Sequence, residues 1–350
     1  METLQPYRVA LFNALSKSFD ITVVCKNKAD YLESSLLFNV INIEVNKFGP
    51  FLYHRGNIFK KSKEFDVVVG LMNIRFLDIM LLAINPFRKY KVVFWGIGVN
   101  ASYNKKFDSH DFSFYIRIFL NYFADSLVFY SCYPVKKHLN FGFNRKSLFV
   151  ANNTVEINSY IESNILDKQN FLFIGTLYAQ KGLSDLFDVY FSAYKELDGE
   201  IPDLVVIGDG PDFAELTKKA NNLSLSHKIK FKGKIQDGYL ISEYFKNTII
   251  TISPNQAGLS VLTSMGNGVP FVTSKHAITG GELLNIENNV NGMLFENNSE
   301  LKEIIKDASL NRKKYFSMGK NAREFYEKNR TIDIMASGII DAINFAKTRD

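Results

Sequence analysis

Short apolar runs rich in β-branched and aromatic residues alternate with longer amphipathic stretches along this chain of 350 residues. In the first half the apolar runs are residues 19–25, 65–70, 91–96 and 125–131, and the amphipathic stretches include 9–19 and 112–124. Runs of this length that end near glycine, serine or a loop are typical of buried strands in a parallel sheet. The amphipathic stretches predict helices that cover such a sheet.

The second half repeats this pattern. Its apolar runs are residues 171–175, 203–210, 228–233, 248–253 and 270–274, and its helical stretches include 183–197 and 211–223. Strands that alternate with helices predict an α/β fold built from two doubly wound units. A polar, asparagine-rich stretch at 151–170 connects them, so we expect a first domain over residues 1–155 and a second over 156–331.

The beginning of the first domain departs from this pattern. A doubly wound domain normally opens with a strand that ends at a glycine turn and a helix N-terminus. Here the first helical pattern begins near Pro6 or Tyr7, and the five residues ahead of it cannot supply a buried central strand. Either the domain is unusual or its first strand is missing because the chain as given starts late. We favour the late start, which predicts apolar codons in frame upstream of Met1.

Composition and cysteine usage are those of an ordinary soluble globular protein. The chain is 46% hydrophobic and 22% charged, and its longest apolar candidate for a membrane span, residues 76–84, contains Asp78 and predicts a buried helix. The start lacks the basic and apolar regions of a signal peptide. Cys25 and Cys132 lie far apart and give neither a disulfide framework nor metal-ligand spacing. We therefore expect a reducing, cytoplasmic setting.

The net charge of +6 is distributed unevenly, with +8 on residues 1–160 and −2 on 161–350. Basic clusters at 59–65, 86–91 and 103–107 contain or adjoin aromatic residues. These clusters could form a patch that binds anionic lipid at the inner membrane surface or a diphosphate-bearing acceptor. Alternatively, they are the solvated surface of a lysine-rich protein. Nucleic acid is not expected as a partner, because no nucleic-acid-binding motif accompanies the charge.

Candidate chemistry gathers at the strand ends of the second half, in residues 175–182, 207–211, 231–235 and 255–261. Carboxyl ends of parallel strands meet at one sheet edge, so these stretches converge. The turn at Gly258 leads into a helix start without charged side chains, where backbone N–H groups can hold an anion. Lys181 can add a point charge to a phosphate. Taken singly, each glycine reads as a turn former and Lys181 as a surface lysine, so the weight lies in their order and spacing.

That order resembles the retaining glycosyltransferases of family 4, which have the two-domain GT-B fold. The resemblance covers roughly residues 170–330 and is carried by "FIGTLYAQKGLSDLF", "LVVIGDGPDFAEL", "IKFKGKI", "GLSVLTSMGNGVPFVTS" and "GGELLNIENNVNGMLFE". In the first half, "WGIGVN" and "NNTVE" are similar to the acceptor domain of polysaccharide-building members. The resemblance implies two Rossmann-like domains that face each other across a cleft, with a last helix, 332–350, that packs back on the first domain.

The resemblance also implies roles for individual residues. Backbone amides of Gly258 to Val261 and the ammonium of Lys181 would hold the donor diphosphate, Gly233 to Ile235 would line the nucleobase site, and Glu282 would lie near the donor. The candidate donor-binding residues are Gly175, Thr176, Lys181, Gly208, Gly210, Gly233, Lys234, Ile235, Gly258, Leu259, Ser260, Val261, Thr263 and Glu282, with Lys181 and Glu282 the catalytic candidates and the general base unknown. The candidate acceptor-binding residues are Tyr7, Arg8, Trp95, Gly96 and Asn100.

Several positions depart from the family pattern. Its members usually carry glutamates where this sequence has Asn255 and Thr263, a basic residue where it has Thr176, and in this subgroup often a histidine where it has Ile97. The donor diphosphate would therefore have fewer charged ligands than usual. No Asp-x-Asp pair is present for Mg²⁺ or Mn²⁺, and backbone N–H groups with one lysine can stabilise a leaving diphosphate without a metal, so no cofactor is expected.

The expected reaction is transfer of a sugar from a nucleotide diphosphate sugar to a lipid-linked or oligosaccharide acceptor, in capsule, O-antigen or exopolysaccharide synthesis. Retention of configuration follows from the resemblance alone. Two alternatives stay open. One is a sugar-nucleotide epimerase, which shares the fold and the donor corner but needs acidic and histidine residues for proton transfer. The other is a binding or scaffold protein that has lost catalysis, which the missing carboxylates at Asn255 and Thr263 favour.

Overall fold

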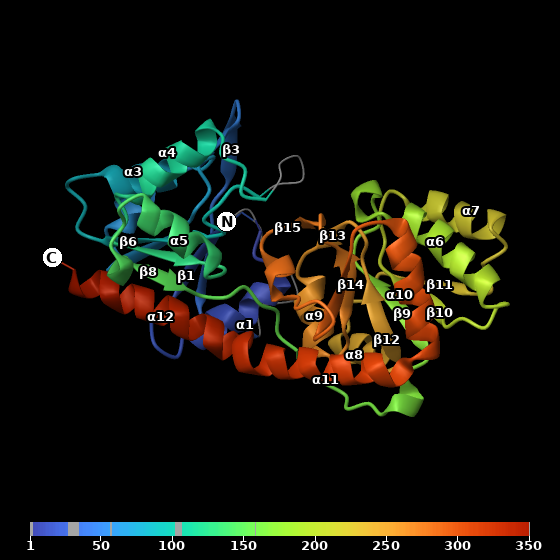
Figure 1. Ribbon diagram of the computed structural model, residues 1–350. Coiled ribbons are helices and arrows are strands. Elements are labelled where there is room, and N and C mark those ends of the chain that lie inside the picture. Colours follow the sequence, from blue (N-terminus) through green and yellow to red (C-terminus); the bar gives the residue numbers. More distant parts are fainter. Residues whose placement is uncertain (1–2, 27–34, 57, 102–106, 158, 350) are drawn as a thin grey trace. The chain divides into compact units, whose positions relative to one another are not determined.

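The chain divides into two compact units in the computed structural model, which describes residues 3–26, 35–56, 58–101, 107–157 and 159–349. Unit 1 consists of Met1–Glu156 together with Arg330–Asp350, and unit 2 of Ile157–Asn329 (Figure 1). Both units are α/β structures whose main sheets are parallel. Among the described residues, no helix has both the length and the apolar character that crossing a bilayer requires.

Unit 1 contains a parallel four-stranded sheet and two separate strand pairs. The sheet has the order β5 (Val67–Leu71), β6 (Lys91–Gly96), β7 (Ser126–Phe129) and β8 (Leu148–Val150). A parallel pair is formed by β1 (Thr22–Cys25) and β2 (Asn39–Asn42), and an antiparallel hairpin by β3 (Val45–Phe48) and β4 (Phe51–His54). The strand patterns at 19–25, 65–70, 91–96 and 125–131 are confirmed, whereas β2, β3, β4 and β8 were not predicted.

The helices of unit 1 form two layers. They are α1 (Pro6–Leu15), α2 (Ile58–Ser62), α3 (Leu77–Ile84), α4 (Phe112–Asn121), α5 (Tyr133–Asn140) and α12 (Ile332–Thr348), with a 3₁₀ turn η2 (Arg145–Ser147). Alternate residues of β6 face the two layers. Val93 and Trp95 share a core with α1 and α12, whereas Val92 and Phe94 share one with α2, α3 and α4. The sheet of unit 1 is therefore covered on both faces, as a doubly wound fold requires.

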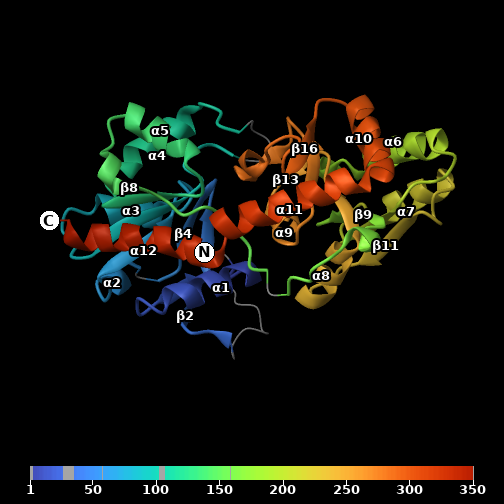
Figure 2. The same ribbon diagram turned by 60° about the horizontal axis from the view of Figure 1, so that its bottom comes forward.

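The last helix belongs to unit 1 although unit 2 precedes it in the chain (Figure 2). Helix α12 contacts α1, β6, β7 and β8. The Ser126 hydroxyl donates to the Ala342 carbonyl at 2.9 Å. A Cβ added at Gly338 would lie 2.2 Å from the Val150 carbonyl oxygen, so glycine allows the helix to approach β8 closely.

Unit 2 contains a parallel six-stranded sheet of order β11-β10-β9-β12-β14-β16. Its strands are β9 (Asn170–Ile174), β10 (Asp203–Ile207), β11 (Ile229–Gly233), β12 (Thr248–Ile252), β14 (Phe271–Ser274) and β16 (Gly292–Phe295). The two-residue strands β13 (Gln256–Ala257) and β15 (Ile278–Thr279) pair beside it. The first strand in chain order, β9, lies in the middle of the sheet and pairs with both β10 and β12.

Helices cover both faces of this sheet as well (Figure 1). They are α6 (Leu183–Glu196), α7 (Phe213–Asn222), α8 (Gly238–Lys246), α9 (Ser260–Gly266), α10 (Asn298–Leu310) and α11 (Arg312–Asn329), with 3₁₀ turns η3 (Ile165–Asp167), η4 (Ala179–Lys181) and η5 (Glu282–Asn285). Phe171 and Phe173 of β9 pack with α6, α7 and α10, whereas Leu172 packs with Phe245 of α8. Side chains alternate across a strand, so a fully buried strand needs apolar residues at successive positions, as β9 has.

Candidate functional site

Three glycine turns lie side by side at the carboxyl edge of the unit 2 sheet. The Gly175 N–H, just after β9, donates to the Ile207 carbonyl at 3.0 Å, and the Gly208 N–H donates to the Gly233 carbonyl at 2.8 Å. Two residues further along both segments, the Leu177 N–H donates to the Asp209 carbonyl at 3.0 Å. The stretches that the sequence predicted to converge here, 175–182, 207–211 and 231–235, are therefore neighbours.

The glycines at this edge serve two different purposes. A Cβ added at Gly208 would lie 1.8 Å from the Gly175 carbonyl oxygen, and one added at Gly210 would lie 2.2 Å from the Leu177 carbonyl oxygen. These two glycines are therefore required for backbone packing. A Cβ added at Gly233 or Gly258 would meet no atom within 4 Å. Open space beside those two leaves room for a ligand to approach the main chain.

Lys181 lies at the end of η4, where Gly182 turns the chain at φ 74° into α6. Its side chain is buried, with 8% of the residue exposed, and this burial lowers the pKa of its ammonium to about 8. A Cβ added at Gly175 would lie 3.5 Å from Lys181 Nζ, so the ammonium lies beside the first glycine turn.

The Lys181 ammonium has no counter-charge within the described part of the chain. It makes no ion pair or hydrogen bond there, and it lies over the Tyr178 ring, whose centroid is 5.6 Å from Nζ. Burying an unpaired charge is unfavourable, and an anion placed beside it would offset that cost. The geometry therefore favours a negatively charged ligand at this point.

The corner between β12 and α9 offers backbone donors. Helix α9 begins at Ser260, and its N-cap residue Leu259 provides no side-chain cap. Among the described residues, the backbone N–H groups of Gly258, Leu259 and Ser260 have no hydrogen-bond acceptor, and the buried Ser260 hydroxyl has no partner. Uncapped N–H groups at a helix start carry partial positive charge and suit an anion.

Asn255 connects this corner to the Lys181 turn. The Asn255 N–H donates to the Lys181 carbonyl at 3.3 Å, and the Asn255 carbonyl accepts from the Ile278 N–H at 2.8 Å. A Cβ added at Gly182 would lie 2.5 Å from the Asn255 amide nitrogen, so the two residues are in close contact. Asn255 has no carboxylate, but it supports the loop that carries Lys181.

Two further predicted donor-binding residues, Thr263 and Glu282, lie in or beside α9. The Thr263 hydroxyl donates to the Leu259 carbonyl at 3.2 Å within the helix. Glu282 is buried at the start of η5, which contacts α9, and its carboxylate accepts from the Gly280 N–H at 3.0 Å. Val261, next to Ser260, is fully buried. Among the predicted donor-binding residues, Glu282 is therefore the one that brings a carboxylate close to this corner.

The other predicted donor residues lie at the rim of the same edge. Thr176 and Lys234 are exposed, and Ile235 is half-buried against the core cluster that contains Ile207 and Phe245. Every predicted donor-binding residue thus lies in unit 2 on a strand end, a turn or the adjoining helix start. Among the described residues, no group of three or more histidine, cysteine, aspartate or glutamate side chains is arranged to hold a metal ion. The individual contacts of these residues with a donor stay predictions.

In unit 1, three predicted acceptor residues come together around Arg8. Its guanidinium lies 4.8 Å from the Trp95 ring and 5.0 Å from the Tyr7 ring. It also donates to the Tyr130 hydroxyl at 3.2 Å and to the Asn153 side-chain oxygen at 3.1 Å, and 8% of the residue is exposed. Arg8 is thus held by partners inside unit 1, and its role toward an acceptor stays a prediction.

Asn100 and Gly96 likewise have internal contacts. The Asn100 amide donates to the Ser109 carbonyl at 2.7 Å and to Asp111 at 2.8 Å, and its oxygen accepts from Arg117 at 2.8 Å. A Cβ added at Gly96 would lie 2.8 Å from Met72 Cβ. Both residues stabilise the loop after β6. They therefore have a structural role that does not depend on a ligand.

One of the basic clusters of unit 1 is held in place by an ion pair. In the cluster at 86–91, Arg88 pairs with Asp125 at 2.5 Å. The cluster at 59–65 includes Lys61 at the end of α2, and most of the cluster at 103–107 lies outside the described residues. Contact with an anionic membrane stays a prediction.

One buried ionisable pair was not foreseen. His54 Nδ1 lies 2.8 Å from Asp78 Oδ2, which also accepts from the His54 backbone N–H at 2.7 Å. Burial raises the pKa of Asp78, but the hydrogen bonds and charge of His54 outweigh it and hold that pKa below its ordinary value. The partners are 24 residues apart without a recognisable motif, so no local signal in the sequence could have found them.

Comparison with known proteins agrees with this arrangement. Residues 157–325 match the family model of glycosyl transferases group 1. An uncharacterised glycosyltransferase of Methanocaldococcus jannaschii is 32% identical over 178 residues, which are 48% of this chain and 43% of that protein. The N-acetyl-alpha-D-glucosaminyl L-malate synthase of Bacillus anthracis is 27% identical over 164 residues, 45% of this chain and 40% of that protein. The matched stretch therefore spans less than half of each relative.

Solved structures match over the whole chain. HepE of Anabaena in complex with UDP superimposes with a TM-score of 0.73 at 17% identity, covering 98% of this chain and 100% of that one. A glycosyltransferase from Rickettsia africae gives a TM-score of 0.72 at 14% identity, covering 100% of this chain and 99% of that one. At these identities the likeness concerns the fold, and it places the chain in the GT-B fold class, which confirms the predicted fold.

Proposed function

We propose that this protein is a group 1 glycosyltransferase that moves a sugar, of the hexose type, from a nucleotide diphosphate sugar to a saccharide acceptor. The observation that carries the proposal is the Lys181 ammonium, which is buried without a counter-charge beside the Gly175 turn. Uncapped backbone N–H groups at Leu259 and Ser260 add a second source of positive potential on the same sheet edge. A diphosphate carries the charge that both features require.

The comparisons support a sugar donor of this kind. The family match covers nearly all of unit 2, where every predicted donor-binding residue lies. HepE, which shares the fold, has been solved with UDP and with UDP-glucose. We therefore infer that unit 2 binds the nucleotide sugar and that uridine diphosphate sugars are the first donors to test.

The chemistry follows from where charge develops. Cleavage of the sugar–phosphate bond leaves negative charge on the diphosphate, and donors already aimed at that position stabilise the transition state. Lys181 and the α9 corner supply such donors from the protein itself, so we propose a reaction that needs no metal. Glu282 is proposed to position the donor sugar. Retention of configuration is proposed on the family resemblance alone.

The acceptor is proposed to be a lipid-linked or free oligosaccharide in the synthesis of a surface polysaccharide. One similar protein is Protein CapJ of Staphylococcus aureus, which is 27% identical over 136 residues. The net charge of +8 on residues 1–160 supports an anionic acceptor and loose contact with the inner face of a membrane. Sedimentation with vesicles containing an anionic lipid, against neutral vesicles, tests this contact.

The experiment for the donor proposal combines binding and turnover. The protein is incubated with a panel of nucleotide sugars, and thermal stabilisation and release of free nucleotide diphosphate are measured, with and without EDTA. We expect one donor to stabilise the protein, to release its nucleotide slowly, and to lose affinity in Lys181→Ala and in Ser260→Pro. Lys313→Ala, an exposed lysine of α11, is the matched control. Unchanged affinity for every donor in both site variants would contradict the proposal.

A catalytically impaired binding protein is the second candidate function, because neither Asn255 nor Thr263 carries a carboxylate. It predicts the same stabilisation by one donor but no nucleotide release, even with lipid extracts as acceptor. A sugar-nucleotide epimerase would instead give an interconverted sugar nucleotide in the absence of any acceptor. Product analysis by mass spectrometry and chromatography separates these outcomes.

A further inference from the structure

One side of helix α4 carries large aromatic side chains that are open to solvent. They are 50–80% exposed and comprise Phe112, Tyr115, Phe119 and the C-cap residue Tyr122. Their spacing of three and four residues places them on one side of the helix. Another side of α4 packs into the core cluster that contains Phe94 of β6. The exposed stripe of four rings is called the aromatic face below.

Further apolar side chains adjoin the aromatic face on neighbouring elements. The Tyr115 ring lies 6.3 Å from the ring of Phe141, an exposed residue that follows α5. The Tyr122 hydroxyl donates to the Phe141 carbonyl. Helix α3 lies beside α4 and exposes Leu77 and Leu81 (Figure 1). Exposed apolar residues that gather on adjoining elements mark an interaction surface, whereas single ones are ordinary.

The segment that contains the aromatic face is basic. Residues 112–150, all of them described, include five lysine and arginine residues and one acidic residue, Asp125. Asp125 is buried and pairs with Arg88 at 2.5 Å, so this segment exposes no carboxylate side chain. Lys136 of α5 is exposed. A partner of the aromatic face therefore meets positive charge beside the rings.

The loop after α3 brings a second basic cluster to the end of α4. The Arg88 guanidinium donates to the Phe123 carbonyl at 3.2 Å, which holds the cluster at 86–91 beside that helix end. The same loop exposes Phe87 together with Lys89. Aromatic and cationic side chains are thus combined at this end of α4 as well.

We propose that the aromatic face is the surface through which unit 1 binds an anionic lipid bilayer, with the rings at the boundary between headgroups and acyl chains. The proposal deepens the membrane contact that is part of the proposed function and rests on it. Aromatic rings are favoured at that boundary, and lysine and arginine gain from the negative surface potential of an anionic leaflet. A second copy of this chain fits less well, because a symmetric contact would set basic residues against their equals.

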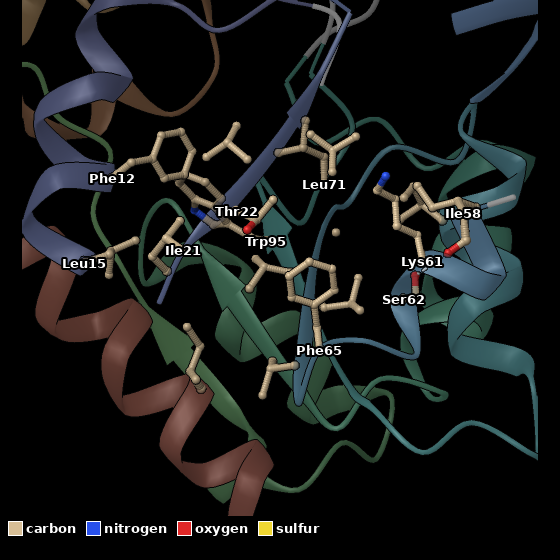
Figure 3. Close-up of a pocket in the computed structure, with 18 of the residues that line it drawn as sticks. Phe12, Leu15, Ile21, Thr22, Ile58, Lys61, Ser62, Phe65, Leu71 and Trp95 are labelled. Carbon is tan, nitrogen blue, oxygen red and sulfur yellow. Dashed lines mark hydrogen bonds between the residues drawn. The ribbon is translucent and has the colours of Figure 1, made fainter. Parts of the chain in front are cut away.

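The cavity of unit 1 is a separate feature that could also take up apolar groups. It measures 220 Å³ and lies between β1 and β5, with Phe12 and Leu15 of α1 on one side and Ile58 of α2 on the other (Figure 3). Its described lining residues include none from α4 or α5. Substitutions on the aromatic face therefore do not alter the cavity lining, so an experiment can separate the two features.

Vesicle sedimentation tests the aromatic face. Phe112→Ser/Phe119→Ser is compared with the wild type and with Leu166→Ser/Leu310→Ser, which removes two similarly exposed apolar side chains from unit 2. The vesicles contain phosphatidylcholine alone or equal parts of phosphatidylcholine and phosphatidylglycerol. We expect the face variant to bind the anionic vesicles roughly tenfold or more weakly than the wild type, because two rings no longer leave water. The unit 2 variant should bind them as the wild type does.

Fluorescence quenching by brominated acyl chains measures insertion directly. Phe119→Trp places a fluorophore on the aromatic face, and Leu310→Trp places one on unit 2, with Trp95 contributing the same background to both. We expect brominated anionic vesicles to quench the added tryptophan in Phe119→Trp and not in Leu310→Trp. This substitution keeps an aromatic ring at position 119, so it tests the face even where the serine variants fail to fold.

Donor binding is measured in the same variants, so that this proposal and the proposed transfer reaction can fail separately. We expect equal thermal stabilisation by a nucleotide sugar in the wild type and in the face variant. The proposal would be overturned by a wild type that ignores anionic vesicles, by equal binding of both double variants, or by equal quenching in both tryptophan variants. A dimer that dissociates in Phe112→Ser/Phe119→Ser, detected by light scattering, would assign the face to a second copy instead. Face-dependent vesicle binding without donor binding would overturn the transfer reaction and support the aromatic face.

Discussion

The two units have the same plan, but only unit 2 has an occupied centre. Its strand β9 is paired on both sides and is buried on both faces, whereas unit 1 has a cavity between β1 and β5. In unit 2 the turn after that central strand carries Lys181. In unit 1 the corresponding turn leads into Tyr7 and Arg8. The comparison indicates that in unit 2 the central strand sets the position of the turn that carries Lys181.

The largest expected difference between the units is the loss of stability when a side chain of β9 or of β5 is truncated. Phe173→Ala in β9 removes a fully buried ring and is expected to destabilise unit 2 by about 3–5 kcal/mol, whereas Val69→Ala in β5 should cost unit 1 under about 0.5 kcal/mol. The chain has a single tryptophan, Trp95, in unit 1. Its fluorescence therefore reports urea unfolding of unit 1, while circular dichroism reports both units.

A large cost for Val69→Ala would contradict the exposure of the β5 edge, where this side chain is 41% exposed. Leu166→Ala, at a surface position that is 81% exposed, is the control for unit 2.

The next effect separates stability from binding at Lys181. Lys181→Met keeps the length of the side chain and removes a buried charge that has no counter-charge. We expect unliganded unit 2 to become more stable by about 1–2 kcal/mol and donor affinity to fall by roughly 10- to 100-fold, since charged hydrogen bonds are lost. Denaturant titration and calorimetric titration measure the two quantities. A loss of stability together with unchanged affinity would assign Lys181 to the fold alone.

A pH dependence follows from two buried lysines of unit 2. Burial lowers the pKa of Lys181 and of Lys168 to about 8, below the ordinary value of 10.5 that they regain on unfolding. Between these values the unfolded chain binds more protons, so the stability of unliganded unit 2 should rise from pH 8 to pH 10.5. Donor affinity should fall over the same range because the diphosphate needs the ammonium. The control is the double variant Lys168→Met/Lys181→Met, in which this rise in stability with pH should be absent.

The smallest effect distinguishes the two kinds of glycine. Gly258→Ala adds a methyl group into open space and should change stability by under about 1 kcal/mol, while it weakens donor binding because the methyl group occupies the ligand side. Gly208→Ala instead forces a Cβ against the Gly175 carbonyl at φ 148° and should destabilise unit 2 outright. Thermal melting with and without donor measures both. Equal behaviour of the two variants would show that Gly258 also has a packing role.

Periodicity and turn residues predicted most of the sheet strands of both units, because apolar runs that end at glycine or a loop are local signals. The short strands β8 and β16 were missed. The site edge of unit 2 was predictable for the same reason, since the glycines and Lys181 follow strand ends directly. The environment of Arg8 was not, because Tyr130 and Asn153 are 122 and 145 residues away. The strands β2, β3 and β4 were missed because each has four residues, mostly exposed or half-buried, and shows little hydrophobic contrast.

Helix α12 has a consequence for how the protein is made. Unit 2 is inserted between residues 156 and 330 of unit 1, and the hydroxyl of Thr154 bonds the carbonyl of Arg330 where the chain returns. Residues 157–329 are synthesised before Ile339 and Ile343, which belong to the core of unit 1. Unit 2 therefore needs no later part of the chain to complete its core, whereas the apolar strands of unit 1 can be covered by α12 only after that helix has been made.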